Sequence, residues 1–339
     1  MSRKSSIFAA HNESPAQRRP LLMINRTLVR TKVLLTLFAY YQNEGKTKFT
    51  AEKELMRSFS DTYSLYFLLL DFVNELTTLA QQKIDDAQER AQAMHTDFNA
   101  NPRFVQNRFA RQLFENRTLR HYLEDQKLSW DAAHDAVENV YRQLIDSDFY
   151  KDYMSSTETS YEADKAVWRK IFTYLLADSE QMENAFDELE VTLDASGWAA
   201  DMNVILSYVV KTIKRFREEN GADQPLLEMF DSEDEVDFAK KLLRLTIEHS
   251  DEYEQLIADA LKNWDADRIA FMDKLILKTS LAEIFGFPSI AVEITMTEYL
   301  DLAHEYSTES SPQFINGVLD QIIRRAKAEN RLLKAVPMN

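Results

Sequence analysis

The chain has 339 residues, which is enough for one large domain or two modest ones. It contains no cysteine, so disulfides, thiol catalysis and cysteine-based metal sites are excluded, and a reducing compartment is favoured. The formal net charge at pH 7 is −16. Taken alone, this charge argues against nucleic-acid binding, because phosphate contacts require lysine and arginine.

The scarcity of glycine and proline predicts an all-α fold. Only 5 glycines and 7 prolines occur in the whole chain, and long stretches without either favour helix. No apolar run approaches the ~20 residues of a membrane span. The longest candidate, residues 65–70, ends at Asp71. No signal-type apolar core follows Arg3 and Lys4, so we expect a cytoplasmic protein that does not contact a membrane.

The N-terminal segment is basic although the chain is acidic. Residues 1–32 carry seven cations and one acid, a local balance of +6. We expect residues 1–22 to form a disordered basic leader and the first helix to span 23–41. Arg26 and Arg30 lie at the start of that helix, where exposed cations oppose the macrodipole at a cost of ~0.3–1 kcal/mol. An RNA phosphate would relieve this cost. The alternative is an ordinary disordered basic tail.

A long helical region follows. The clearest breaks in it are residues 194–198 and 218–225, where glycine or proline occurs among polar residues. Residues 231–235 form an acidic loop, which faces either solvent or a basic partner. In chain order, the helices expected here span 50–98, 102–127, 129–149, 159–177, 178–195 and 199–219.

The most basic internal stretch is residues 99–120, which hold five arginines interleaved with phenylalanines. Proteins that bind single-stranded RNA combine such residues, because arginine contacts phosphate and aromatic rings stack on bases. The competing interpretation is an amphipathic helix with phenylalanine inside and arginine outside. The sequence leaves both open.

No pattern of catalytic or metal-binding residues emerges. The six histidines form no H-E-x-x-H or H-x-H arrangement, and no glycine-rich phosphate loop or G-x-S-x-G elbow occurs. We therefore predict a protein that is not an enzyme, with no catalytic residue, metal ion or cofactor.

The segment 307–325 is the most informative part of the chain. Ser311 is expected as a helix N-cap and Pro312 as the first helical residue. Phe314 begins an apolar stripe at helical spacing. Gly317 lies inside this helix at a cost of ~1 kcal/mol against alanine, which favours either a close helix–helix contact or the motif of a family.

The same segment resembles the closing motif of the NusB family of transcription antitermination factors, F-x-x-E-x-S-x-x-F-V-N-G-V-L-D. Residues 264–277 resemble its W-x-x-x-R-I-x-x-x-D-x-x-I-L motif, and 281–284 and 296–303 resemble further family segments. Residues 26–38 resemble its basic, then apolar, first helix. The positions that match the closing motif in order are Tyr306, Glu309, Ser311, Phe314, Ile315, Asn316, Gly317, Val318, Leu319 and Asp320.

The resemblance implies a NusB-like helical bundle formed by residues 23–45 and 236–330. Residues 46–235 would be an extended helical insertion of unknown role, and 331–339 a tail. A NusB protein acts without catalysis: it binds the boxA element of nascent RNA together with a NusE-type small-subunit ribosomal protein, within the antitermination complex of RNA polymerase. This implies transcription regulation, especially of ribosomal RNA operons.

The residues that the resemblance carries over form two sets. Glu283 matches a family acidic position on the partner side. Gln313 departs from the family, where a basic residue is usual, and this weakens the case for RNA contact. A NusB-fold protein-interaction module without RNA binding therefore remains the alternative. A ribosomal RNA cytosine methyltransferase with a NusB-like domain is disfavoured, because no glycine-rich cofactor loop or catalytic cysteine is present. The implied RNA-binding residues are Arg26, Arg30, Phe38, Ser311 and Phe314.

Overall fold

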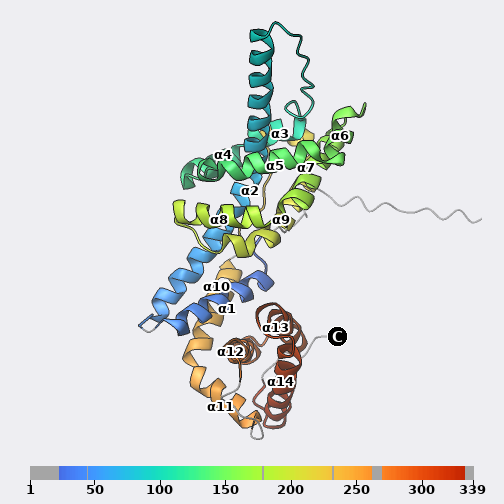
Figure 1. Ribbon diagram of the computed structural model, residues 1–339. Helices are drawn as coiled ribbons and strands as arrows, with labels where there is room; N and C mark the ends of the chain where they lie inside the picture. The colour runs from blue at the N-terminus through green and yellow to red at the C-terminus, as the bar shows by residue number, and fades with distance from the viewer. Residues whose placement is uncertain (1–22, 44, 178, 231–232, 262–268, 333–339) are drawn as a thin grey trace, which may run out of the picture.

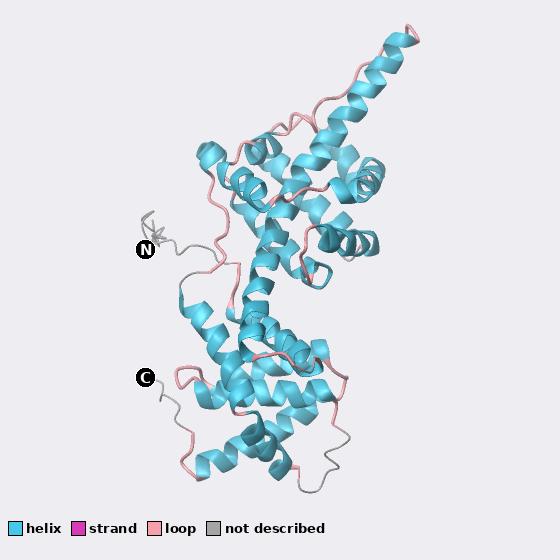
Figure 2. Ribbon diagram, turned by 90° about the vertical axis from the view of Figure 1, so that its left-hand side faces the viewer, coloured by secondary structure: helices cyan, strands magenta, loops and turns pink. Residues whose placement is uncertain are grey.

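The computed structural model describes residues 23–43, 45–177, 179–230, 233–261 and 269–332. Across these residues the chain forms helices joined by loops, with no strand (Figure 2), so the predicted all-α class is confirmed. The expected leader 1–22, and the tail from residue 333 onward, lie outside the described residues.

The first and the last described helices lie in one half of the molecule, which we call the terminal lobe. Here α1 (Arg26–Gln42) packs against α10 and α12, and α12 packs against α13 and α14. In Figure 1 the blue α1 accordingly lies among orange and red helices. The other helices of this lobe are α10 (Glu233–Glu248), α11 (Ser250–Ala260), α12 (Phe271–Gly286), α13 (Val292–Tyr306) and α14 (Ser311–Ala328).

The other half, which we call the central lobe, is formed by the middle of the chain (Figure 1). Its helices pack around α2 and α9, and all three of its largest fully buried side chains are tryptophans: Trp130, Trp168 and Trp198. Its elements are α3 (Arg108–Phe114), α4 (Arg117–Gln126), η2 (Asp131–Ala133), α5 (His134–Asp146), α6 (Asp148–Ser155), α7 (Tyr161–Ile171), the π-helical turn η3 (Phe172–Leu176), α8 (Glu180–Thr192), α9 (Trp198–Arg215) and η4 (Glu218–Asp223).

One long helix, α2 (Lys48–Ala93), connects the lobes. The side chain of Thr47 caps its start by accepting a hydrogen bond from the Thr50 amide, and no glycine or proline interrupts its 46 residues. Residues 64–73 are buried on all sides because helices surround α2 there, whereas its distal end projects as an exposed arm (Figure 2). The expected helix over 50–98 is thus present with shifted ends.

Several expected helices are shorter or divided. The helix expected over 102–127 is two helices, because Asn107 and Asn116 each cap a new start by accepting a backbone N–H three residues on. The helix expected over 129–149 divides into η2, α5 and part of α6. The expected break at 194–198 is confirmed, and Gly197 there has a φ of +79°, a conformation that favours glycine.

The structure contradicts two expectations about α14. Ser310, not Ser311, precedes the helix, and Ser311 is its first residue with its hydroxyl directed to Asp273 instead of to the helix backbone. Gly317 does not mark a close contact either, because a Cβ at that position would meet no atom within 4 Å. The glycine that a neighbour does approach is Gly286, where a Cβ would clash with Cδ1 of Leu245.

A polar network joins the two lobes. Lys32 of α1 forms an ion pair with Asp201 of α9 at 2.5 Å, and both side chains are buried. Thr62 of α2 donates its hydroxyl proton to the same carboxylate. Near the start of α1, the amide of Asn25 donates to the Tyr208 hydroxyl at 3.1 Å. Lys32, one of the seven cations of residues 1–32, therefore has a partner inside the protein.

Candidate nucleic-acid interface

Arg30 and Glu283 form a buried ion pair in the terminal lobe. The guanidinium of Arg30 donates two hydrogen bonds to the Glu283 carboxylate, each 2.8 Å long. Thr295 and Tyr299 donate to the same carboxylate at 2.8 and 3.4 Å, and Glu298 lies 3.2 Å from the guanidinium. The pair therefore binds α1, α12 and α13 together.

The protonation states of this cluster follow from its contacts. Burial alone lowers the pKa of Arg30, but the hydrogen bonds and charge of Glu283 outweigh it, and the net shift is upward. Burial and the charge of Glu283 both raise the pKa of Tyr299, so its hydroxyl keeps its proton and can donate. Arg30 is thus a permanent cation whose charge is already neutralised inside the protein.

This geometry changes the interpretation of two expected site residues. Arg30 is 2% exposed and Glu283 is 0% exposed, so in this conformation neither can touch RNA or a partner protein. Both are expected at a surface from the sequence, because each matches a position of a family motif. Their partner in the structure is each other, across 253 residues of sequence. The periodicity of apolar residues within a helix cannot predict such a pairing.

Arg26 lies one helical turn before Arg30 and remains exposed. Its guanidinium rests over the ring of Phe238 in α10, 5.1 Å from the centroid. It forms no ion pair with any described residue, so its charge is available to a polyanion.

Phe38 and Ser311 are linked through the start of α12. The ring of Phe38 meets Phe271 edge to face with centroids 5.6 Å apart. Two residues on, Asp273 accepts hydrogen bonds from Ser307 and Ser311 at 2.5 and 3.0 Å. The beginnings of α12 and α14 are therefore held together, with Phe38 beside them.

A surface hollow of about 940 Å³ opens at this junction. Ser311 and the half-buried Phe314 line it, together with Gln313 and the open side of Gly317. Its volume suits a nucleotide-sized group or larger. Of the expected RNA-binding residues, the structure thus gathers Ser311 and Phe314 at one hollow, with Phe38 near by. Arg26 lies at the opposite end of α1.

Two residues of this junction, Phe271 and Asp273, were not expected as site residues. Asp273 occupies the aspartate position of the upstream motif, which was the available signal. Phe271 is 42% exposed at the start of α12, and only its contact with Phe38 identifies it. Trp264 and Arg268, which begin the same motif, lie outside the described residues.

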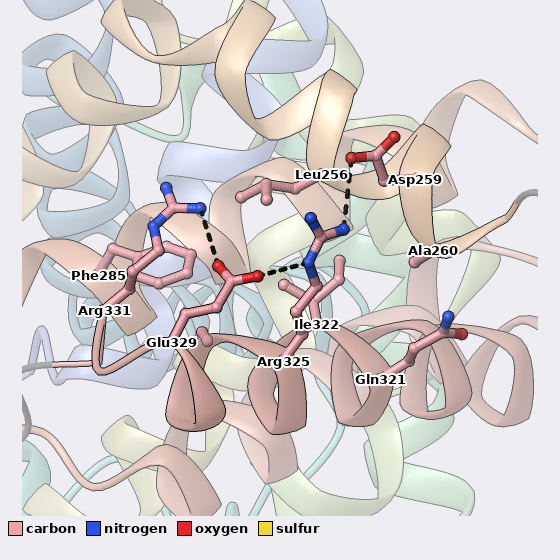
Figure 3. Close-up of a pocket in the computed structure, with 10 residues that line it drawn as sticks. Leu256, Asp259, Ala260, Phe285, Gln321, Ile322, Arg325, Glu329 and Arg331 are labelled. Atoms are coloured by element: carbon pink, nitrogen blue, oxygen red, sulfur yellow. Dashed lines mark hydrogen bonds and ion pairs between the residues drawn. The ribbon is translucent and has the colours of Figure 1, made fainter.

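The smaller pocket at the end of α14 does not suit a ligand. Its volume is about 30 Å³, far below the ~300 Å³ of typical small-molecule sites. As Figure 3 shows, Glu329 lies between Arg325 and Arg331, and Asp259 contacts Arg325 from the other side. The arginines at this end of the chain are therefore largely paired with carboxylates.

The residues described by the structure contain no group of three histidine, aspartate or glutamate side chains arranged to hold a metal ion. Within the same residues, no helix is long and apolar enough to span a membrane.

The sequence model of the NusB family matches residues 202–324. The transcription antitermination protein NusB of Thermodesulfovibrio yellowstonii is 32% identical over 125 residues, which cover 37% of this chain and 78% of the relative. That of Geobacter sulfurreducens is 37% identical over 108 residues, or 30% and 78% of the two chains. That of Koribacter versatilis is 37% identical over 102 residues, or 30% and 70%. No solved structure shows significant similarity.

By these matches and its fold, this protein is an all-α relative of transcription antitermination proteins. The chain belongs to the NusB family. The match begins within α9, upstream of the boundary at 236 expected from the motifs, and it includes the whole junction of α12 and α14. The chain is longer than these relatives, because the matched residues make up 30–37% of it but 70–78% of them. Where the family core ends and the insertion begins stays a prediction.

Proposed function

We propose that this protein is a transcription antitermination factor that binds boxA-type nascent RNA together with a NusE-type ribosomal protein, in the antitermination complex of RNA polymerase. The observation that carries the proposal is the hollow lined by Ser311 and Phe314, beside the Phe38–Phe271 pair. It lies within the family match and combines aromatic rings with polar groups. Single-stranded RNA is recognised by such a combination, through stacking and hydrogen bonds.

In this proposal the expected residues take different roles. Phe38 and Phe314 stack on bases or line their path, and the Ser311–Asp273 hydrogen bond fixes the junction that presents them. Arg26 supplies a phosphate contact at the far end of α1. Arg30 and Glu283 act as positioning residues, because their ion pair sets α1 against α12 and α13.

The protein acts by binding and not by catalysis, in the cytoplasm, where transcripts are made. The ribosomal partner of this family binds RNA and is expected to be basic. A chain with a net charge of −16 attracts such a partner and speeds the encounter.

The test is an RNA titration with full-length protein, a boxA-like oligonucleotide and a scrambled one of equal composition. Phe314→Ala and Phe38→Ala should each weaken boxA binding by about 1–3 kcal/mol if a base stacks on the ring. Phe49→Ala is the matched control, because Phe49 is 67% exposed and lies at the start of α2, outside this junction. Equal binding of both oligonucleotides by the wild type would contradict the proposal.

The charge of Arg26 gives a second readout. Each phosphate neutralised on a single strand contributes ~0.7 to the slope of log affinity against log salt. Arg26→Ala should lower the slope by that amount, and Arg324→Ala is a control at the opposite terminus, where Asp320 already pairs with the arginine at 2.7 Å.

A second candidate is a NusB-fold interaction module that does not bind RNA. Gln313, at the rim of the hollow where a basic residue is usual, favours it, as does the burial of Arg30 and Lys32. The two candidates separate in a calorimetric titration with the NusE-type protein. The antitermination proposal expects RNA affinity to rise when that protein is present. Protein binding without any RNA affinity would favour the module.

A further inference from the structure

The segment formed by α3 and the first turn of α4, in the central lobe, is basic and carries an exposed aromatic ring. Residues 108–120 hold four arginines and a single acid, Glu115, in a chain that is otherwise strongly acidic. Both helices bury their other side, through Phe109, Leu113 and Leu119. Phe114 is 60% exposed at the end of α3. We call Arg111, Phe114, Arg117 and Arg120 the α3–α4 face.

The cations of this face are available. Among the described residues, Arg111 and Arg120 have no ion-pair or hydrogen-bond partner for their side chains. Arg117 pairs with Asp223 at 2.9 Å, but both side chains are about 70% exposed, so the pair is weak and open to exchange. The other arginine of this stretch, Arg108, differs, because it is held by Asp164, Glu218 and the carbonyl of Thr159.

The turn between the two helices is held rigidly from behind. Asn116 caps α4 by accepting from the Leu119 amide, and its own amide donates to the Gln224 carbonyl at 2.9 Å. Gln112 donates to the carbonyls of Arg217 and Gly221, also at 2.9 Å. Both residues are buried. The backbone positions that carry Phe114 and the arginines on either side of it are therefore fixed before any ligand arrives, so binding does not have to order the backbone.

We propose that the α3–α4 face binds single-stranded RNA without sequence preference. Arg111 and Arg120 contact phosphates, and Phe114 offers its ring to a base. Cations that flank an exposed ring are the combination used by sequence-tolerant single-strand binding proteins. An acidic peptide would use the charges but would gain nothing from the ring. The face lies in the central lobe, apart from the junction of α12 and α14 (Figure 1), so the site does not depend on the proposed boxA function.

The probe is a labelled 20-nucleotide oligouridylate, titrated into full-length protein at several salt concentrations. Arg111→Ala with Arg120→Ala should lower the slope of log affinity against log salt by about 1.4, or ~0.7 for each phosphate that is no longer neutralised. The matched control is Arg90→Ala with Arg142→Ala. Both residues are exposed and lie on α2 and α5, and the two substitutions remove the same amount of charge. The control should leave the slope unchanged.

Phe114→Ala separates stacking from charge. It should weaken oligouridylate binding by roughly 5- to 150-fold without changing the salt slope, whereas Tyr174→Ala, at a ring 67% exposed elsewhere in the central lobe, should have no effect. The substituted side chains are exposed, so unfolding midpoints should match the wild type.

Three results would overturn the proposal: no oligouridylate binding by the wild type at low salt, equal binding by the wild type and the face variants, or equal losses in the control variants. In the second case, weaker binding of polyglutamate by the face variants would assign the face to an acidic protein. A short boxA-like oligonucleotide, measured with the same variants, distinguishes this test from that of the proposed function. The face variants should still bind it in preference to a scrambled oligonucleotide, because that preference belongs to the other site.

Discussion

Two pairs of cations, one pair in each lobe, have opposite surroundings. In the terminal lobe, Arg30 and Lys32 lie at the basic start of the chain, yet both are buried in ion pairs. In the central lobe, Arg111 and Arg120 lie in the middle of an acidic chain, yet both are exposed and have no partner among the described residues. A basic segment of sequence therefore does not by itself indicate a basic surface.

The difference arises from how each helix is surrounded. α1 is covered by α2, α10 and α12, so a cation on its inner side has no route to water and must meet a carboxylate. Glu283 and Asp201 supply those carboxylates. α3 and α4 cover α2 from one side only, and their outer cations keep their hydration at no cost.

The largest effect should come from breaking the Arg30–Glu283 pair. Arg30→Ala leaves the Glu283 charge buried without its cation, and we expect a loss of about 3–5 kcal/mol in the free energy of unfolding. Denaturation by urea measures it. The double variant Arg30→Met with Glu283→Leu should recover most of the loss, because no charge then remains buried. A loss below about 1 kcal/mol for Arg30→Ala, the range of an exposed pair, would make Arg30 a candidate RNA contact again.

Breaking the pair that joins the lobes should cost somewhat less. Lys32→Met removes the cation beside Asp201, but the Thr62 hydroxyl still donates to that carboxylate, so we expect a loss of about 3 kcal/mol. Circular dichroism and tryptophan fluorescence should be compared during urea unfolding, since three of the four tryptophans lie in the central lobe. Transitions that separate in the variant would show that this pair couples the lobes. Coincident transitions at unchanged stability would contradict its role.

A buried acid of the central lobe gives a pH-dependent effect. Burial raises the pKa of Asp71 to about 6, opposed in part by a hydrogen bond from Asn74. Because the folded pKa lies above the unfolded value of ~3.9, stability falls as the pH rises from about 4 to 6 and then levels off. Asp71→Asn removes this loss, and we expect it to stabilise the protein by about 2–3 kcal/mol at pH 8 and by much less at pH 4. The same gain at both pH values would show that charge burial is not the cause.

The sequence predicts much of this structure for identifiable reasons. The all-α class follows from the few glycines and prolines, and the break before α9 from Gly197. The junction of α12 and α14 is indicated by a motif whose residues are close together in sequence. The Arg30–Glu283 and Lys32–Asp201 pairs cannot be predicted in this way, because they depend on contacts between helices 169 or more residues apart. The division between α3 and α4 is not evident from the sequence either, because asparagine marks a helix break less clearly than glycine or proline does.

The smallest expected effect concerns Gly317, and it distinguishes packing from ligand binding. A methyl group there meets no atom within 4 Å, so Gly317→Ala should gain helix propensity and stabilise the protein by about 0.5–1 kcal/mol. If Gly317→Ala is destabilised instead, the close helix–helix contact that the sequence suggested would be supported.

Because Gly317 lines the hollow beside Phe314, an added side chain would occupy space that RNA needs in the proposed function. Gly317→Leu fills more of that space than Gly317→Ala. If both variants are stable and boxA affinity falls in the order glycine, alanine, leucine, the glycine serves the ligand. If both variants bind boxA RNA as tightly as the wild type, the RNA does not contact the part of the hollow that Gly317 lines.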